Sequence, residues 1–232
     1  APAEVPWSGR AEALNADYRA NLEAPAVSPL DMAVVVKTLH RHLGENTVYT
    51  NGAGNFSGWL HRYTPYPALH HHGRTQLAPT SGAMGYGLPA AVAAALLYPD
   101  RHVVNLAGDG DFLMNGQELA TATGYGAGRG AGRLLSVVVD NGTYGTIRMH
   151  QEREYPGRVS GSDLFNPDFA ALARAYGWHA ATVDRTEAFE PALAEALAAG
   201  RPALLHLKLD ADVSTSRTTL SAIRASAQAA GR

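Results

Sequence analysis

The segment LLSVVVDNG, residues 134–142, decides the fold, because a nearly uninterrupted apolar run stops abruptly at a polar turn. Its valines favour a strand, and the Asp-Asn-Gly that follows favours a turn. An apolar run without polar alternation is typical of a strand that is buried on both faces of a sheet. Further strands of this kind are expected at residues 47–50, 102–107, 180–183 and 203–209.

Segments with helical spacing separate these strands. The Ser28-Pro29 pair is typical of a helix cap with proline in the first helical position. Strands that alternate with helices predict an α/β fold, a doubly wound parallel sheet with helices on both faces. The expected helices span residues 11–22, 30–43, 88–97, 115–123, 168–176 and 189–198.

The composition narrows the class of protein. The chain has 232 residues, of which 46% are hydrophobic and 17% charged, with a formal net charge of −2. This balance disfavours nucleic-acid binding, and no apolar run reaches the length of roughly 18 residues that a membrane helix needs. The chain has no cysteine, so disulfides and thiolate chemistry are excluded. We expect a cytoplasmic protein without a nucleic-acid or membrane partner.

The chain divides into three parts by composition. Residues 1–27 are rich in proline and alanine and are expected to form a linker or arm. Residues 28–209 hold the alternating strands and helices, and so form the predicted domain. Residues 210–232 are expected to form a C-terminal tail.

Glycine and oxygen-bearing residues follow three of the strands, at residues 51–55, 108–111 and 140–145. In open α/β sheets, ligands bind outside the carboxyl ends of the strands. Glycines there let backbone N–H groups approach a phosphate, which the start of a following helix also favours. Asp109 and Asn141 could offer a carboxylate and an amide oxygen to Mg²⁺, which prefers few protein oxygens. The sequence therefore predicts a metal-bridged diphosphate at this edge of the sheet.

Other glycine-rich or acidic motifs fit less well. An EF-hand starting at Asp109 fails, because Leu113, Met114 and Ala120 occupy its fifth, sixth and twelfth positions. A dinucleotide fingerprint at residues 52–57 fails, because Ser57 stands where the third glycine belongs. The glycines of residues 126–132 follow a helix and precede a strand, so they predict a surface loop. The sequence has no Walker A motif.

The run GDGDFLMNG, residues 108–116, with Asn141 placed 32 residues after Asp109, resembles the fingerprint of thiamine-diphosphate-dependent enzymes. Asp140 departs from that fingerprint, which usually has an Asn-Asn pair there. The segments TSGAMGYGLPAA (80–91) and YGTIRMHQ (144–151) are most similar to the acetolactate synthase large-subunit group. The resemblance covers residues 28–209 and implies the C-terminal (PP) domain of such an enzyme.

This resemblance implies a role for nine residues. The side chains of Asp109 and Asn141 would bind Mg²⁺, with the backbone carbonyl of Thr143 as the third protein ligand. The Met84 side chain would lie beneath the bent cofactor. The expected contacts of thiamine diphosphate are Gly54, Asn55 and the backbone amides of Gly110 and Asp111 at the diphosphate, and Gly82 and Met84 at the aminopyrimidine.

The resemblance also implies an activity, the decarboxylation of a 2-keto acid followed by carboligation. The catalytic Glu of this family comes from a Pyr domain, and nothing in this sequence matches it. We therefore expect a chain that is inactive alone, a fragment or one half of a split enzyme in a homo-oligomer. A 2-keto acid decarboxylase of the benzoylformate or sulfopyruvate type and a non-catalytic cofactor-binding domain remain the alternatives.

Two further positions belong to these expectations. His150 stands near the place where many acetolactate synthases have a Trp that shapes the pocket for the second substrate. The run of residues 70–72, three histidines, is expected to be plain surface or a loop facing the site rather than a metal cluster, because adjacent side chains converge poorly on one ion.

Overall fold

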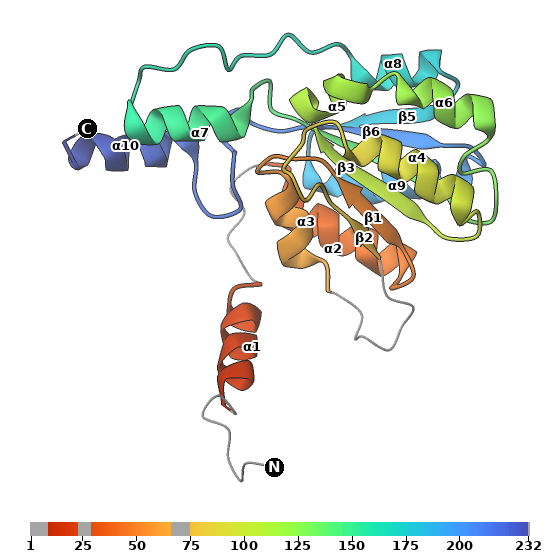
Figure 1. The fold of residues 1–232 in the computed structure, drawn as a ribbon, viewed down its shortest axis with the longest axis horizontal. Helices are drawn as coiled ribbons and strands as arrows, with labels where there is room; N and C mark the ends of the chain where they lie inside the picture. The colour runs from red at the N-terminus through yellow and green to blue at the C-terminus, as the bar shows by residue number, and fades with distance from the viewer. Residues whose placement is uncertain (1–8, 23–28, 66–74, 232) are drawn as a thin grey trace.

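The computed structural model describes residues 9–22, 29–65 and 75–231. Its six strands form one parallel sheet in the order β2-β1-β3-β4-β6-β5 (Figure 1). The predicted α/β fold with a doubly wound parallel sheet is therefore confirmed. The strands are β1 (Val48–Asn51), β2 (Gln76–Leu77), β3 (Val103–Gly108), β4 (Leu134–Asp140), β5 (His179–Val183) and β6 (Ala203–Lys208).

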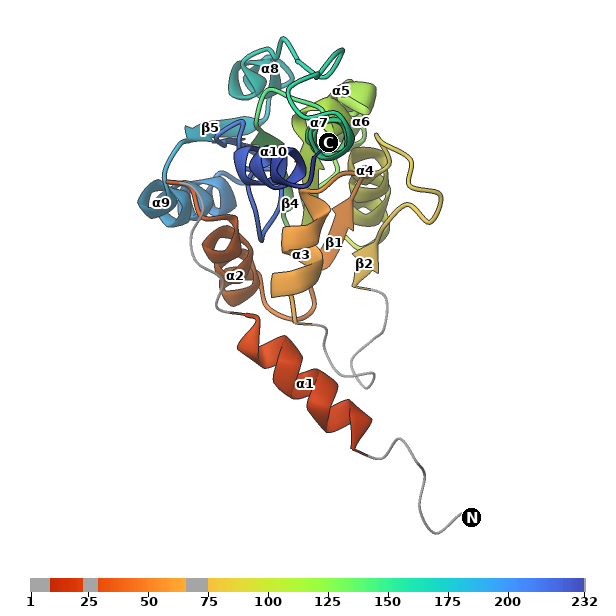
Figure 2. The same ribbon diagram turned by 90° about the vertical axis from the view of Figure 1, so that its left-hand side faces the viewer.

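Helices lie on both faces of this sheet. Figures 1 and 2 show α2, α3 and α9 on one face and α4, α5, α6 and α8 on the other. The described helices are α1 (Arg10–Ala20), α2 (Met32–Leu43), α3 (Ser57–Tyr63), α4 (Gly87–Leu97), α5 (Asp109–Asn115), α6 (Glu118–Tyr125), α7 (Gly145–Glu154), α8 (Phe169–Ala175), α9 (Thr186–Ala198) and α10 (Leu220–Ala229). No described helix has the length and apolar character needed to cross a membrane.

The strands separate two apolar cores by the alternation of their side chains. In β3, Val104 and Leu106 join the core beneath α2, α3 and α9, whereas Val103 and Ala107 join the core beneath α4, α6 and α8. Successive side chains of a strand point to opposite faces, so an almost wholly apolar strand fills both cores at once. This explains why β3 and β4 lack the alternation of apolar and polar residues that is typical of a strand with one solvent-exposed face.

Two predicted helix starts are wrong. Helix α2 begins at Met32 rather than at Pro29, because the Asp31 carboxylate accepts the backbone N–H groups of Ala33 and Val34 and caps it there. Ser28 lies outside the described residues. The predicted helix start at residue 115 is also wrong, because helix α5 already begins at Asp109 and the next helix, α6, begins at Glu118.

The segments outside the sheet-and-helix body include α1, α7 and α10. Helix α1 lies in the predicted arm, buries none of its side chains and contacts the body through a hydrogen bond from the Tyr18 hydroxyl to the Arg62 carbonyl. Helices α7 and α10 lie side by side and project from the body (Figure 1). The buried Glu152 of α7 accepts hydrogen bonds from Arg224 of α10, so residues beyond 209 contain a packed helix.

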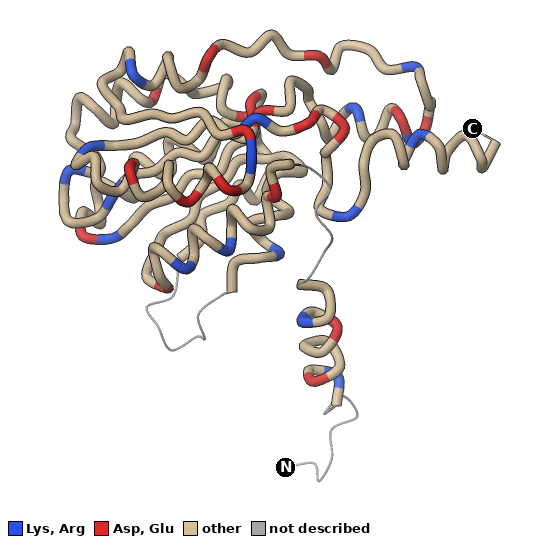
Figure 3. The backbone as a smooth tube through the Cα atoms, turned by 180° about the vertical axis from the view of Figure 1, so that it is seen from behind, with Lys and Arg blue, Asp and Glu red and all other residues tan. Residues whose placement is uncertain are grey.

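Basic and acidic residues are interspersed along the backbone of the described chain (Figure 3). This distribution agrees with the formal net charge of −2 over the whole sequence. The pattern is that of an ordinary surface rather than of a single-sign stripe.

Candidate functional site

A cavity of about 260 Å³ lies at the carboxyl ends of β1, β3 and β4. From β1 the chain runs outward to β2 at the sheet edge, and then returns to β3 on the other side of β1. Such a reversal of strand order leaves a crevice at the carboxyl edge, where α/β sheets bind ligands. All nine residues predicted as ligand contacts line this cavity: Gly54, Asn55, Gly82, Met84, Asp109, Gly110, Asp111, Asn141 and Thr143.

The loop after β1 forms one wall of the cavity. The backbone N–H of Asn55 donates to the Thr146 hydroxyl at 3.0 Å, and its side-chain amide donates to the Ser214 hydroxyl at 3.1 Å. Thr146 lies on α7 and Ser214 lies before α10, so this loop is held by two segments far along the chain. These contacts fix the backbone that faces the cavity.

Asp109 lies at the floor of the cavity and is 3% exposed. Its Oδ1 accepts the N–H of Gly110 at 2.9 Å, and its Oδ2 accepts the N–H of Gly142 and the amide of Asn166, both at 2.8 Å. Burial raises the pKa of this carboxyl to about 6, against the hydrogen bonds from Gly110 and Asn166, and the nearby Asp140 raises it further. The group is therefore costly to ionise until a cation approaches.

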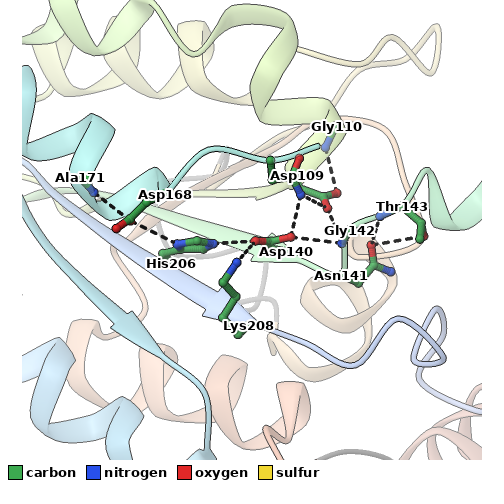
Figure 4. A network of polar contacts seen from close by, with 11 residues as sticks. Asp109, Gly110, Asp140, Asn141, Gly142, Thr143, Asp168, Ala171, His206 and Lys208 are labelled. Atoms are coloured by element: carbon green, nitrogen blue, oxygen red, sulfur yellow. Dashed lines mark hydrogen bonds and ion pairs between the residues drawn. The ribbon is translucent and has the colours of Figure 1, made fainter. Parts of the chain in front are cut away.

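Asp140, the departure from the usual Asn-Asn pair, is the centre of a polar network (Figure 4). Its Oδ2 accepts His206 Nε2 at 2.7 Å and Lys208 Nζ at 2.5 Å, and its Oδ1 accepts Asn166 Nδ2 at 2.7 Å and the N–H of Gly142 at 3.1 Å. Burial alone would raise the pKa of Asp140, but these hydrogen bonds hold it well below its usual range. Asp140 is thus a fixed negative charge beside Asp109.

Asn141 and Thr143 follow β4 and face the cavity from the same turn. The Asn141 amide oxygen accepts the N–H of Thr143 at 3.2 Å, which orients the side chain (Figure 4). The Thr143 carbonyl accepts the N–H of Gly145 at 2.8 Å and keeps a second lone pair. Both oxygens belong to the chemical types that Mg²⁺ binds.

Asp111 and Met84 lie toward another part of the cavity. The family resemblance implied only a backbone contact for Asp111, yet its side chain is also engaged, since Oδ1 accepts the N–H of Gly85 at 2.7 Å. Burial raises the pKa of Asp111 to about 6, against the hydrogen bonds from Gly85 and Ala53. The carboxylate therefore connects α5 to the turn that carries Met84.

The sequence pattern missed several residues of this site. Apolar side chains line the cavity from Phe56, Trp59, Ile147, Leu209 and Val213. Asn166 and His206 gave no motif, although His206 and Lys208 alternate with leucines in β6, and that alternation was an available signal. The three histidines at residues 70–72 lie outside the described residues.

The residues present fit a divalent cation with a diphosphate. A carboxylate offers about four lone-pair positions, of which the Asp109 hydrogen bonds above use three. The buried Asn166 Oδ1 has no hydrogen-bond partner among the described residues, which adds an acceptor beside Asp109. Those residues contain no cluster of three or more His, Cys, Asp or Glu side chains suited to a metal. The donor set therefore suits a cation that takes its other ligands from phosphate and water.

This fold and this site together define an α/β domain with a cavity at the carboxyl ends of its strands, whose oxygen atoms and closely approaching backbone suit a cation and a diphosphate. Residues 52–207 match the family model described as the thiamine pyrophosphate enzyme, C-terminal TPP binding domain. The chain belongs to this family of thiamine-pyrophosphate-dependent enzymes, as its motifs had indicated.

Similar proteins agree with this membership. The chain is 34% identical over 183 residues to the acetolactate synthase large subunit of Parasynechococcus marenigrum (strain WH8102), with 78% of this chain and 27% of the relative covered. It is 35% identical over 181 residues to the acetolactate synthase isozyme 2 large subunit of Escherichia coli (strain K12), with 76% and 31% covered. The chain thus spans about a third or less of the length of these relatives.

A solved structure shares the fold. It is the thiamine diphosphate-dependent 4-hydroxybenzoylformate decarboxylase of Rhodococcus jostii RHA1, with a TM-score of 0.70 and 31% sequence identity. The match covers 81% of this chain and 34% of the decarboxylase chain. The parallel sheet described above is therefore the thiamine-diphosphate-binding fold.

Proposed function

We propose that this chain binds Mg²⁺ and the diphosphate end of thiamine diphosphate in the cavity at the carboxyl ends of β1, β3 and β4. The observation that carries the proposal is the convergence of nine predicted contact residues, from four separate stretches of sequence, on that one cavity. A site for a metal ion and a diphosphate needs oxygen ligands for the ion and backbone N–H groups that can approach the phosphates, and this cavity offers both.

The two ends of the cavity bind different parts of the ligand. Asp109 and Asn141 hold Mg²⁺ with their side chains, and Thr143 adds its carbonyl. The backbone amides of Gly110 and Asp111 bind the diphosphate together with Gly54 and Asn55, whereas Gly82 and Met84 meet the aminopyrimidine. Apolar side chains such as Trp59 and Leu209 exclude water from the region between these ends.

The activity of the whole enzyme is of the acetolactate synthase kind. Bound thiamine diphosphate supplies an electron sink for the decarboxylation of a 2-keto acid. The catalytic Glu comes from a Pyr domain, in the same longer chain or in a separate subunit, so this chain is inactive alone. Support comes from the acetolactate synthase large subunits that match it over about three quarters of its length. The proposed enzyme is a cytoplasmic homo-oligomer.

A 2-keto acid decarboxylase is the second candidate. The similar solved structure is that of a 4-hydroxybenzoylformate decarboxylase, which supports this alternative. His150 also stands near the position where many acetolactate synthases have a Trp that shapes the second-substrate pocket. The choice between the two depends on whether the decarboxylated substrate is released or joined to a second carbonyl.

Calorimetric titration of the chain with thiamine diphosphate, with and without Mg²⁺, tests the binding site. We expect Mg²⁺-dependent binding by the wild type, and its loss in Asp109→Ala because the only carboxylate assigned to the cation is removed. Asp184→Ala, which removes an exposed carboxylate, is the matched control and should bind as the wild type does. An unchanged affinity in Asp109→Ala would remove Asp109 as a ligand.

Turnover assays with pyruvate test the activity. The chain is assayed with thiamine diphosphate and Mg²⁺, alone and mixed with a Pyr-domain chain. Turnover by the chain alone contradicts a missing catalytic Glu. With the Pyr domain present, acetolactate as product supports the carboligase and acetaldehyde supports the decarboxylase, whereas binding without any turnover indicates a non-catalytic domain.

A further inference from the structure

One helix face holds both backbone polar groups of Gly85. The Gly85 N–H donates to Asp111 Oδ1 at 2.7 Å, and the Gly85 carbonyl accepts from Asn115 Nδ2 at 2.9 Å. Asp111 and Asn115 are four residues apart on α5, so they lie one above the other on the same side of the helix. Gly85 directly follows Met84, so it is the residue through which α5 holds the turn that lines the cavity.

The Asp111 carboxylate also reaches the loop after β1. It accepts the N–H of Ala53 as well as that of Gly85, and it is 3% exposed. One buried side chain of α5 thus joins two loops that line the cavity from different places. A buried carboxylate that accepts backbone N–H groups makes charge-assisted hydrogen bonds, which are shorter and stronger than neutral ones.

The two loops approach α5 too closely for any side chain to intervene. A Cβ added at Gly52 would lie 1.8 Å from Asp111 Oδ1, and one added at Gly85 would lie 2.7 Å from the Met114 Cβ. Gly85 also has a φ of +81°, a left-handed conformation that glycine adopts without strain. This contact therefore requires glycine at both positions, and the turn that carries Met84 has little conformational freedom.

From this arrangement we infer that Asp111 and Asn115 are positioning residues that set the turn carrying Met84 relative to the metal end of the cavity. The inference rests on the proposed function. Helix α5 begins with Asp109 and Gly110, which the proposal places at the cation and the diphosphate, and it ends with Asn115. The same short helix thus fixes the distance between the diphosphate end and the end that receives the heterocycle. We refer to the hydrogen bonds between α5 and Gly85 as the brace. A ligand that carries both a diphosphate and a heterocycle gains affinity from this brace, whereas diphosphate alone does not.

Titration of two ligands separates this role from general structural support. Mg²⁺–thiamine diphosphate and Mg²⁺–pyrophosphate are each titrated into the wild type, Asn115→Ala and the exposed control Asn15→Ala. Asn115 is the better first variant, because Asp111 also holds the Ala53 loop near the diphosphate. We expect Asn115→Ala to weaken thiamine diphosphate binding by about fivefold and by no more than about tenfold, because the ligand must then order a turn that this hydrogen bond no longer holds, and to change pyrophosphate binding by less than about twofold.

The other outcomes overturn the inference. Equal weakening of both ligands in Asn115→Ala would show general damage to the site, and no weakening of either would show that the brace does not matter. A wild type that binds pyrophosphate but gains nothing from the thiamine part contradicts both the proposed function and this role. Asn15→Ala should match the wild type throughout.

Hydrogen exchange of the ligand-free wild type tests the brace without any variant or cofactor. The Gly85 amide, bound to a buried carboxylate, should exchange at least tenfold more slowly than the Met84 amide. Comparable exchange at the two amides would show that α5 does not hold the turn, even if thiamine diphosphate binds. This measurement also decides the question if Asn115→Ala fails to fold.

Discussion

The buried carboxyl of Asp109 should make the ligand-free chain less stable at neutral pH than at mildly acidic pH. Its pKa is raised from 3.8 to about 6 in the folded chain, chiefly by burial. Folded Asp109 therefore keeps its proton to higher pH than the unfolded chain does. Its contribution to stability is complete below about pH 3.8 and is lost as the pH rises through about 6.

The size of this loss follows from the shift. Between pH 5 and pH 7, a carboxyl with these two pKa values removes about 1.3 kcal/mol from the free energy of unfolding. Urea denaturation of the wild type and Asp109→Asn at both pH values measures it, because the variant cannot titrate. The comparison uses the change with pH in each protein, so that other effects of the substitution cancel.

We expect the wild type to lose about 1.3 kcal/mol more than Asp109→Asn over this interval. The exposed control Asp184→Asn should follow the wild type. Saturating Mg²⁺ and thiamine diphosphate should shrink the loss, because a bound cation favours the ionised carboxylate. Equal pH dependence in wild type and Asp109→Asn would refute the reasoning that burial holds a proton at this site.

Two further substitutions test a buried ion pair between α7 and α10 and a close backbone approach at the cavity. Arg224→Met removes the partner of the fully buried Glu152 and should lower the free energy of unfolding by about 2 kcal/mol in urea titrations, and unchanged stability would contradict the pairing. Gly52→Ala places a Cβ 1.8 Å from the Asp111 carboxylate and should weaken thiamine diphosphate binding more than about tenfold by calorimetry. Gly58→Ala, whose Cβ meets nothing within 4 Å, is its matched control and should bind normally.

The strands of the central sheet could be predicted because their own residues decide them. The apolar runs that became β3 and β4 have no other stable place than between two layers of helices. Strand β2 could not be predicted, because it consists of Gln76 and Leu77 and owes its conformation to pairing with Tyr49 and Thr50 of β1. Two residues carry no periodicity of their own.

Two of the helices that the sequence did not predict, α5 and α10, were missed for different reasons. The glycine-rich start of α5 is typical of a turn. The segment is helical nevertheless, because Phe112 is buried against α8 through a ring contact with Phe169, and this packing stabilises the helix. Tertiary contacts outweighed local propensity there. Helix α10 is different: it is rich in alanine and is capped by the Thr219 side chain, so its own residues favour a helix, and the prediction of a tail over residues 210–232 overlooked that signal.

The residues of the candidate site likewise include some that could be predicted from the sequence and some that could not. Asp109 and Asn141 could be placed because each directly follows a recognisable strand, and strand ends meet at one edge of the sheet. Asn166 could not be placed, since its contact with Asp109 spans 57 residues and no pattern in between requires it. The pairing of Asp140 with His206 spans 66 residues and is equally invisible in the order of the chain.

The hydrogen bond from Asn55 to Ser214 also bears on how the molecule is made. These residues are 159 positions apart, and Ser214 leaves the ribosome after all the residues of the sheet. A nascent chain can pair its strands early, because domains fold as their residues emerge. The wall that Ser214 gives the cavity forms only once that residue has emerged. A ligand therefore meets the complete cavity wall only after this segment has emerged and packed, which places the completion of the site after the synthesis of the sheet.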